Sequence, residues 1–208
     1  MNGFLKQFEA PIETFFDKGP EEPKKQVLAD ILQYANTNPA TFKRQLKDIP
    51  FDTVNMPWAV ILEALAADTD NWGDFFVETL DEIFNKAKQA AKPNAVLDSL
   101  LDFNYTEKDE KPFNQKIVDR LMRYMGDENV TIKIAAIKML PNYLANPSIK
   151  NKQQIIDALC SQLNNPNWKV RYVAYASLGY ENLLPPGKKL SLKDRVLKLI
   201  LGDPMFEK

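Results

Sequence analysis

The hydrophobic positions of residues 117–140 predict two helices joined by a short turn. Apolar residues first recur at the spacing of one face of a helix with 3.6 residues per turn, at Ile117, Val118, Leu121, Met122 and Met125. Turn-forming residues follow at 126–129, and their short polar side chains can cap a second helix. That second helix has a predicted core side made of Ile132, Ala136 and Leu140.

The same pattern returns 38 positions later, at residues 155–178. Six of the 24 aligned positions are identical. Five further pairs keep apolar with apolar or basic with basic: Val118/Ile156, Met122/Cys160, Met125/Leu163, Ile132/Val170 and Lys133/Arg171. The second copy therefore predicts another helix pair, with a core side made of Val170, Ala174 and Leu178.

A partial third copy follows at the same shift. Leu197 and Leu201 align with Leu159 and Leu163, and Asp203-Pro204 aligns with Asn165-Pro166. We expect a terminal half-repeat that caps the array with a more soluble surface, because a stack of repeats has to end in one.

The repeated order of residues resembles the HEAT repeat of armadillo-like α-solenoids. An acidic or amide residue is followed by an apolar-basic pair and then by Ala and Leu at four-residue steps; the matching positions are Asp127, Ile132, Lys133, Ala136 and Leu140, then Asn165, Val170, Arg171, Ala174 and Leu178. The resemblance covers about residues 116–204. It implies an all-α fold, a right-handed α-α superhelix of about five helical pairs, in which acidic and basic positions typically form a ladder between repeats. Lys133 and Asn165 depart from the family's Arg and Asp.

Residues 1–112 are predicted to be helical without a regular repeat. Apolar residues at helical spacing favour helices at 27–35, 57–67 and 75–90, with further helices near 5–16, 41–47 and 95–101. Residues 104–112 are the candidate connection. We expect one α-solenoid domain over 1–208, because helix pairs on both sides of this segment can stack continuously.

Charge is divided unevenly between the two parts of the 208-residue chain, whose net charge is −1. Residues 1–112 hold 12 basic and 20 acidic side chains, a net −8, and residues 113–208 hold 15 and 8, a net +7. This asymmetry is typical of a surface for an acidic partner, or of an electrostatic dipole that aids solubility. The scattered positions of the basic residues favour the dipole.

No catalytic, metal or cofactor site is predicted. The chain has no histidine, the commonest general base and metal ligand, and its seven glycines form no phosphate-binding loop. The single cysteine, Cys160, excludes an intramolecular disulfide and occupies the apolar stripe, which predicts a packing role. Residues 68–74 resemble part of a calcium loop, but Trp72 and Thr79 stand where ligands are required, which favours a capped turn between helices.

A cytoplasmic protein is expected. The first residues lack a basic region followed by an apolar run, and no stretch approaches the roughly 18 apolar residues of a membrane span.

A second apolar side on the repeat helices is the candidate binding surface. At 100° per residue, Tyr172 and Tyr175 point away from the predicted core side, as do Ile134 and Ile137 in the first copy. Trp168 and Arg171 lie beside them. The alternative is that neighbouring repeats bury this side, because solenoid helices have neighbours on several sides.

Three functions are compatible with these features. The first is a non-catalytic helical-repeat scaffold that binds another protein through its curved surface, with an unidentified protein as partner. The second is a nucleic-acid-binding protein similar to HEAT-like DNA glycosylases, using the basic second half with its aromatic residues. The third is an enzyme that uses carboxylates alone, for which the sequence selects no pair. The scaffold is favoured.

Overall fold

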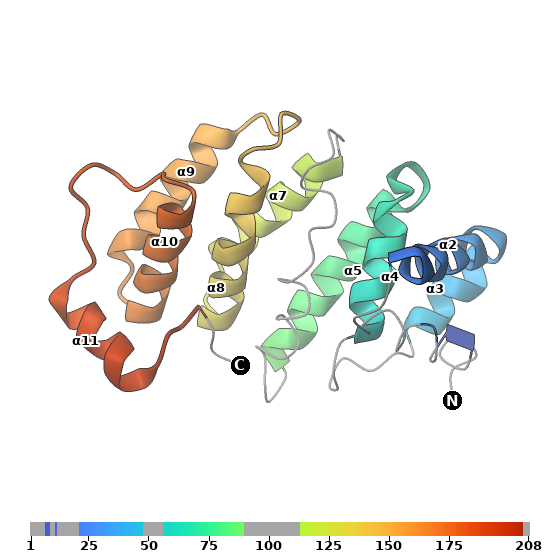
Figure 1. Cartoon of the computed structure of the whole chain (residues 1–208), viewed down its shortest axis with the longest axis horizontal. Helices are drawn as coiled ribbons and strands as arrows, with labels where there is room; N and C mark the ends of the chain where they lie inside the picture. The colour runs from blue at the N-terminus through green and yellow to red at the C-terminus, as the bar shows by residue number, and fades with distance from the viewer. Residues whose placement is uncertain (1–6, 9–10, 12–20, 48–55, 90–112, 206–208) are drawn as a thin grey trace. The chain divides into compact units, whose positions relative to one another are not determined.

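The computed structural model describes residues 7–8, 11, 21–47, 56–89 and 113–205 (Figure 1). Every regular element in these ranges is a helix, which confirms the predicted all-α class. Contacts divide the chain into two compact units, Met1–Lys86 and Ala87–Lys208. The predicted connection at 104–112 and the helix at 95–101 lie outside the described residues, as does most of the helix expected at 5–16. One continuous solenoid remains a prediction.

The first unit contains the helices predicted at 27–35, 41–47, 57–67 and 75–90. They are α2 (Glu21–Thr37), α3 (Pro39–Lys47), α4 (Met56–Ala66) and α5 (Thr69–Gln89), whose last residues belong to the second unit. The apolar side chains of α4 are buried around nearly its whole circumference, which is expected of a helix that is covered on most sides. The turn before α5 is capped as predicted, because the Asp68 carboxylate accepts a hydrogen bond from the backbone N–H of Asn71 (3.4 Å).

The second unit contains the repeats. Its helices are α7 (Phe113–Met125), α8 (Val130–Met139), α9 (Lys152–Ser161), α10 (Trp168–Tyr180) and α11 (Leu192–Leu201), with short 3-10 turns η1 (Leu140–Tyr143) and η2 (Gln162–Asn164) after α8 and α9. α8 packs against both α7 and α10, and α10 also contacts α9 and α11. Each second helix of a pair therefore contacts its own first helix and the next copy.

The turns of the copies share one local hydrogen-bond pattern, as the 38-residue spacing predicts. The side chains of Asn129 and Asn167 cap α8 and α10, accepting bonds from Thr131 N (3.0 Å) and Lys169 N (2.9 Å). The acidic or amide position closes the same local turn in three copies. Asp127, Asn165 and Asp203 each accept a bond from the backbone N–H two residues later, at 2.9, 3.0 and 3.0 Å.

The predicted core positions of the two complete copies are buried. Exposure is zero for all three residues of each second-helix stripe, Ile132, Ala136, Leu140, Val170, Ala174 and Leu178. The third copy differs, because Leu201 is 56% exposed although its equivalent Leu163 is buried. Asp194 is the buried residue of α11, so a carboxylate and its partners hold this helix where apolar residues hold the others.

Substitution of the buried leucines tests this core. Leu159→Ala and Leu178→Ala are each expected to lower the free energy of unfolding by roughly 2–5 kcal/mol, because each leaves a cavity. Urea unfolding followed by circular dichroism measures the loss, and hydrogen exchange locates it in α9 and α10. Leu199→Ala is the matched control, since Leu199 is 83% exposed, and should change stability by less than about 0.5 kcal/mol. Equal effects of the buried and exposed substitutions would contradict the repeat assignment.

Candidate partner-binding surface on helices α10 and α11

The connection between α10 and α11 brings the two helices together. Asn182 adopts a left-handed conformation (φ 56°) just after α10, and Leu183 N donates to Leu178 O (2.8 Å). At the start of α11, the Ser191 hydroxyl caps the helix by accepting a bond from Asp194 N (3.0 Å). Gly202 ends α11 at φ 94°, a conformation that suits glycine. The chain then turns back at Asp203.

An ion pair fixes the beginning of α11 to α10. Arg171 Nε donates to Asp194 Oδ2 (3.0 Å), and a second contact joins Arg171 Nη2 to Asp194 Oδ1. The remaining guanidinium nitrogen donates to the carbonyl oxygens of Asn165 (2.7 Å) and Pro166 (2.9 Å) in the turn before α10. The Arg171 side chain thus joins the turn, α10 and α11. Its contact with Asp194 is bidentate, which arginine can form and lysine cannot.

The pair shifts the pKa of both groups. The Arg171 hydrogen bonds, together with the bond from Ser191, hold the pKa of Asp194 below its usual value, although burial acts the other way. The same pairing raises the pKa of Arg171. This Arg171–Asp194 bond joins neighbouring copies, but it uses Asp194 and not the repeated acidic position Asp203. Arg171 therefore pairs with an acid of the next helix, and Asp203 closes the local turn instead.

A second polar cluster fixes the end of α11. The Tyr172 hydroxyl donates to Asp203 Oδ2 (3.0 Å), and Lys198 Nζ lies 2.8 Å from the same oxygen and 5.0 Å from the Tyr172 ring centroid. Burial raises the pKa of Tyr172. Burial also acts to raise the pKa of Asp203, but hydrogen bonds from Lys198, Met205 N and Tyr172 outweigh it and hold that pKa below its usual value. The hydrogen bond to Asp203, and next that to Tyr172, raise the pKa of Lys198.

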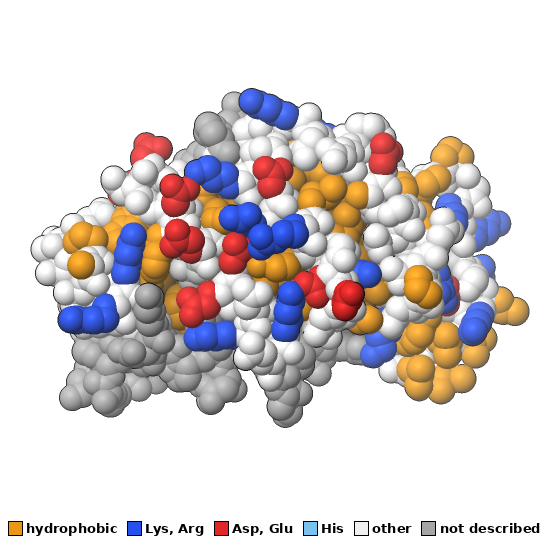
Figure 2. Space-filling model, turned by 180° about the vertical axis from the view of Figure 1, so that it is seen from behind, with side chains coloured by type: hydrophobic (Ala, Val, Ile, Leu, Met, Phe, Trp, Pro, Cys, Tyr) orange, Lys and Arg blue, Asp and Glu red, His pale blue; other side chains and the backbone are white. Residues whose placement is uncertain are grey.

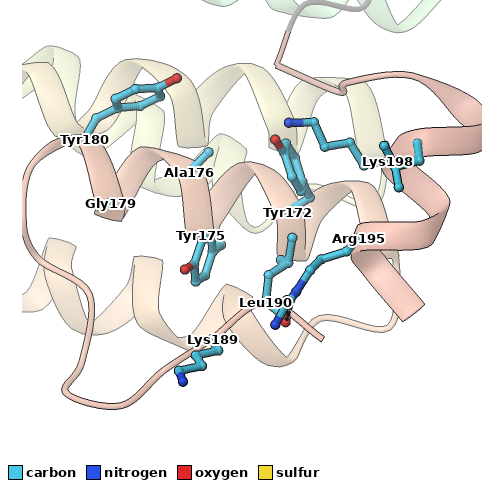
Figure 3. Close-up of a pocket in the computed structure, with 10 residues that line it drawn as sticks. Tyr172, Tyr175, Ala176, Gly179, Tyr180, Lys189, Leu190, Arg195 and Lys198 are labelled. Carbon is cyan, nitrogen blue, oxygen red and sulfur yellow. Dashed lines mark hydrogen bonds between the residues drawn. The ribbon is translucent and has the colours of Figure 1, made fainter. Parts of the chain in front are cut away.

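A cavity of about 860 Å³ lies between α10, α11 and the connection that joins them. Figure 3 shows tyrosine side chains extending from α10 and two cationic side chains extending from α11. Its lining combines aromatic and aliphatic residues with cations: Tyr172, Tyr175, Tyr180, Leu190, Leu199, Lys189, Arg195 and Lys198. Arg195 Nε donates to Leu190 O (3.0 Å), which fixes its place at the rim. Such a mixture suits an apolar group with negative charge beside it.

An exposed apolar stripe runs along α11 beside this cavity. The large exposed hydrophobic side chains of the described residues are Tyr180 at the end of α10 and five residues of α11. Four of the five form the stripe, Leu192, Val196, Leu199 and Ile200, while Leu201 lies on the other side of the helix. In Figure 2 the corresponding cluster of hydrophobic side chains occupies the lower right edge, with Lys and Arg nearby. The expected soluble cap is therefore not what α11 provides. Exposed apolar patches of this kind mark interaction sites more often than isolated exposed leucines do.

The structure separates the residues predicted to bind a partner. Tyr172 and Tyr175 line the cavity, although the Tyr172 side chain is largely buried and bonded to Asp203. Trp168 is half-buried at the start of α10. Ile134 and Ile137 are buried in α8, so neighbouring helices cover the second apolar side of that helix. The partly exposed Arg171 is committed to Asp194.

Sequence reasoning missed the main exposed surface. Leu192, Val196, Leu199 and Ile200 follow the spacing i, i+4, i+7 and i+8, which the helical periodicity could have identified as one side of α11. Comparison with Leu159 and Leu163 instead drew attention to the opposite side, at Leu197 and Leu201. The apolar content of both sides was the available signal.

No group of three or more Cys, Asp and Glu side chains in the described ranges is placed to hold a metal ion. Burial, and secondarily Asp157, raises the pKa of the Cys160 thiol, which favours the unreactive protonated form. Among the described helices, none combines the length and the apolar character that crossing a membrane requires.

Comparisons with protein-family models, curated proteins and solved structures found no match to this chain.

The Arg171–Asp194 pair predicts a pH-dependent stability of the second unit. Asp194 has a lowered pKa in the folded chain, so its contribution is complete above the unfolded pKa of about 3.9 and is lost as the pH falls through the folded value. Asp194→Asn is expected to lower the free energy of unfolding by roughly 1–3 kcal/mol at pH 7, because Arg171 loses its carboxylate partner. Hydrogen exchange in α10 and α11 measures the loss, which should shrink below about pH 4. A difference from wild type that stays constant down to pH 3 would contradict this role.

Proposed function

We propose that the chain is a non-catalytic, HEAT-like α-solenoid that binds another protein through α11 and the adjoining cavity. This surface is called the α10–α11 surface below and consists of Leu192, Val196, Leu199, Ile200, Tyr175, Tyr180 and the cavity lining. The single observation that supports it most is the exposed apolar stripe of α11, where Leu199 and Ile200 are 83% and 72% exposed.

The way α11 is held supports this proposal. Polar bonds at both ends, from Arg171 and from Tyr172 with Lys198, position the helix without covering its apolar stripe. A helix ordered in this manner presents its side chains before a partner arrives, which lowers the entropic cost of binding. Tyrosine, which this surface presents at Tyr175 and Tyr180, is also one of the residue types that commonly contribute most to interface affinity.

Several basic side chains of the second unit are already bonded internally, which favours a protein partner over nucleic acid. Arg171 pairs with Asp194, Lys198 pairs with Asp203, and Lys138 Nζ donates to Met205 O (2.8 Å). A nucleic-acid surface needs cations directed at successive phosphates, and bonds of this kind reduce the number that can serve. The exposed leucines contribute nothing to phosphate binding.

Loss of the apolar stripe is expected to remove the partner while the fold is retained. Leu199→Ser with Ile200→Ser changes two highly exposed side chains, so circular dichroism and unfolding should match wild type within about 0.5 kcal/mol. Affinity capture with wild type and the double variant, followed by mass spectrometry, identifies proteins bound by the first and not the second. The Kd of the purified partner is then expected to rise by at least about 100-fold, corresponding to two anchors of about 1.4 kcal/mol each.

Gln154→Ser is the matched control, because Gln154 is an exposed residue of α9 outside the proposed surface. It should leave the Kd unchanged. A titration with duplex and single-stranded DNA at two salt concentrations tests the alternative, since binding through phosphates weakens steeply with salt. Equal capture by the double variant and wild type would refute the proposed surface, and salt-dependent DNA binding by both would favour the nucleic-acid function.

A further inference from the structure

We infer that the α10–α11 surface binds an acidic amphipathic helix of its partner, with the apolar side of that helix on α11 and its acidic residues beside the apolar side. This inference rests on the proposed function and specifies the chemistry of the segment that is bound.

The spacing of the exposed apolar residues fits a helix as the bound segment. Leu192 and Ile200 are eight residues apart, so the stripe extends for about 12 Å, or roughly two helical turns. A helix lying along it could place side chains at i, i+3, i+4 and i+7 against the stripe and into the 860 Å³ cavity beside it. The described residues include no strand, so an extended segment would find no sheet edge there to extend.

Cations flank the stripe on both sides. At 100° per residue the stripe covers about 100° of α11, from Leu199 to Ile200; Arg195 lies about 40° beyond its first edge and Lys193 about 20° beyond its second. Asp194, the acidic residue of this helix, is on the opposite side and buried against Arg171. The exposed part of α11 is therefore apolar along its centre and positive along both margins.

The connection before α11 adds positive charge to the same surface. Lys189 lines the cavity beside Tyr175 and Leu190, and Lys188 lies next to it in an exposed part of the chain. An apolar helix with Glu or Asp at its margins complements this arrangement in both respects. A basic helix would bring like charges together, which costs binding free energy and disfavours that partner.

The same charge argument disfavours a second copy of α11 as the occupant. Two copies packed through this stripe would bring Lys193 and Arg195 close to their equivalents. Self-association could take another form, in which this surface binds residues 1–112 of a second copy, whose net charge is −8. An anionic membrane is a further class, because a basic amphipathic helix can lie at its surface. The cavity favours a helix, since side chains of a partner can fill it and a flat bilayer cannot.

Three labelled peptides of equal length test the inference with the full chain. The first is a 16-residue amphipathic helix with Leu at i, i+3, i+4 and i+7 and Glu at the margins. The second has Lys in place of each Glu, and the third has the residues of the first in scrambled order. Fluorescence anisotropy is expected to give at least about ten-fold tighter binding for the acidic helix than for the other two, with weaker binding at higher salt.

Charge reversal on α11 provides the decisive variant. Lys193→Glu with Arg195→Glu is expected to invert the preference, so that the basic helix binds at least about ten-fold more tightly than the acidic one. Circular dichroism checks that the helices persist. Leu199→Ser with Ile200→Ser should weaken both acidic-peptide and basic-peptide binding, which separates the apolar contribution from the charge.

Each other outcome overturns the inference in a distinct way. No binding of the acidic helix, or equal binding of the acidic and basic helices, refutes the acidic partner, while loss of a captured protein in the serine variant would still support the proposed function. If wild type forms a dimer in sedimentation velocity and the serine variant is a monomer, the occupant is a second copy. Sedimentation with phosphatidylcholine–phosphatidylserine vesicles that exceeds peptide binding, and that the serine variant loses, identifies a membrane surface.

Discussion

The ion pair between Arg171 and the buried Asp194 determines how the last repeat is arranged. Arg171 also bonds to the carbonyl oxygens of the turn before α10, so the position of α11 depends on a guanidinium that is itself fixed at several atoms. A buried pair of this type contributes little stability relative to an apolar contact of the same volume, but it is costly to break. Its contribution here is to position α11, and the cluster of Tyr172, Asp203 and Lys198 does the same at the other end.

The polar attachment explains why α11 differs from the other repeat helices. Core leucines such as Leu159 and Leu178 hold the complete copies together, and little apolar surface of those helices remains exposed. In α11 the contacts with α10 are made by Asp194 and Lys198, and the four apolar residues of the stripe remain exposed. A helix held by charge can keep its apolar stripe available, and this arrangement links the packing of the repeat to the proposed binding surface.

Local features of the repeat could be predicted from the sequence because they depend on neighbours within a few positions. Asn129 and Asn167 cap helices through their side chains. The acidic or amide residue two positions earlier closes a turn by accepting a bond from the backbone N–H of that asparagine. The predicted core stripes followed from the 3.6-residue period, which fixes which residues share one side of a helix. The binding side was harder to predict, because a helix in an array has several buried sides. The 3.6-residue period does not show how many neighbouring helices cover it.

By itself the sequence determined the all-α class, the helix pairs, their turns and the buried side of each complete copy. Tertiary structure alone decided which charges remain free and which apolar side is exposed. Tyr172, Ile137 and Leu199 each stand between a basic and an apolar residue in the sequence. The packing of α8 and α10 nevertheless buries the first two, while Leu199 on α11 is exposed. The physical reason is that burial and charge neutralisation depend on contacts between residues far apart in the chain, such as Arg171 with Asp194, which no local spacing specifies.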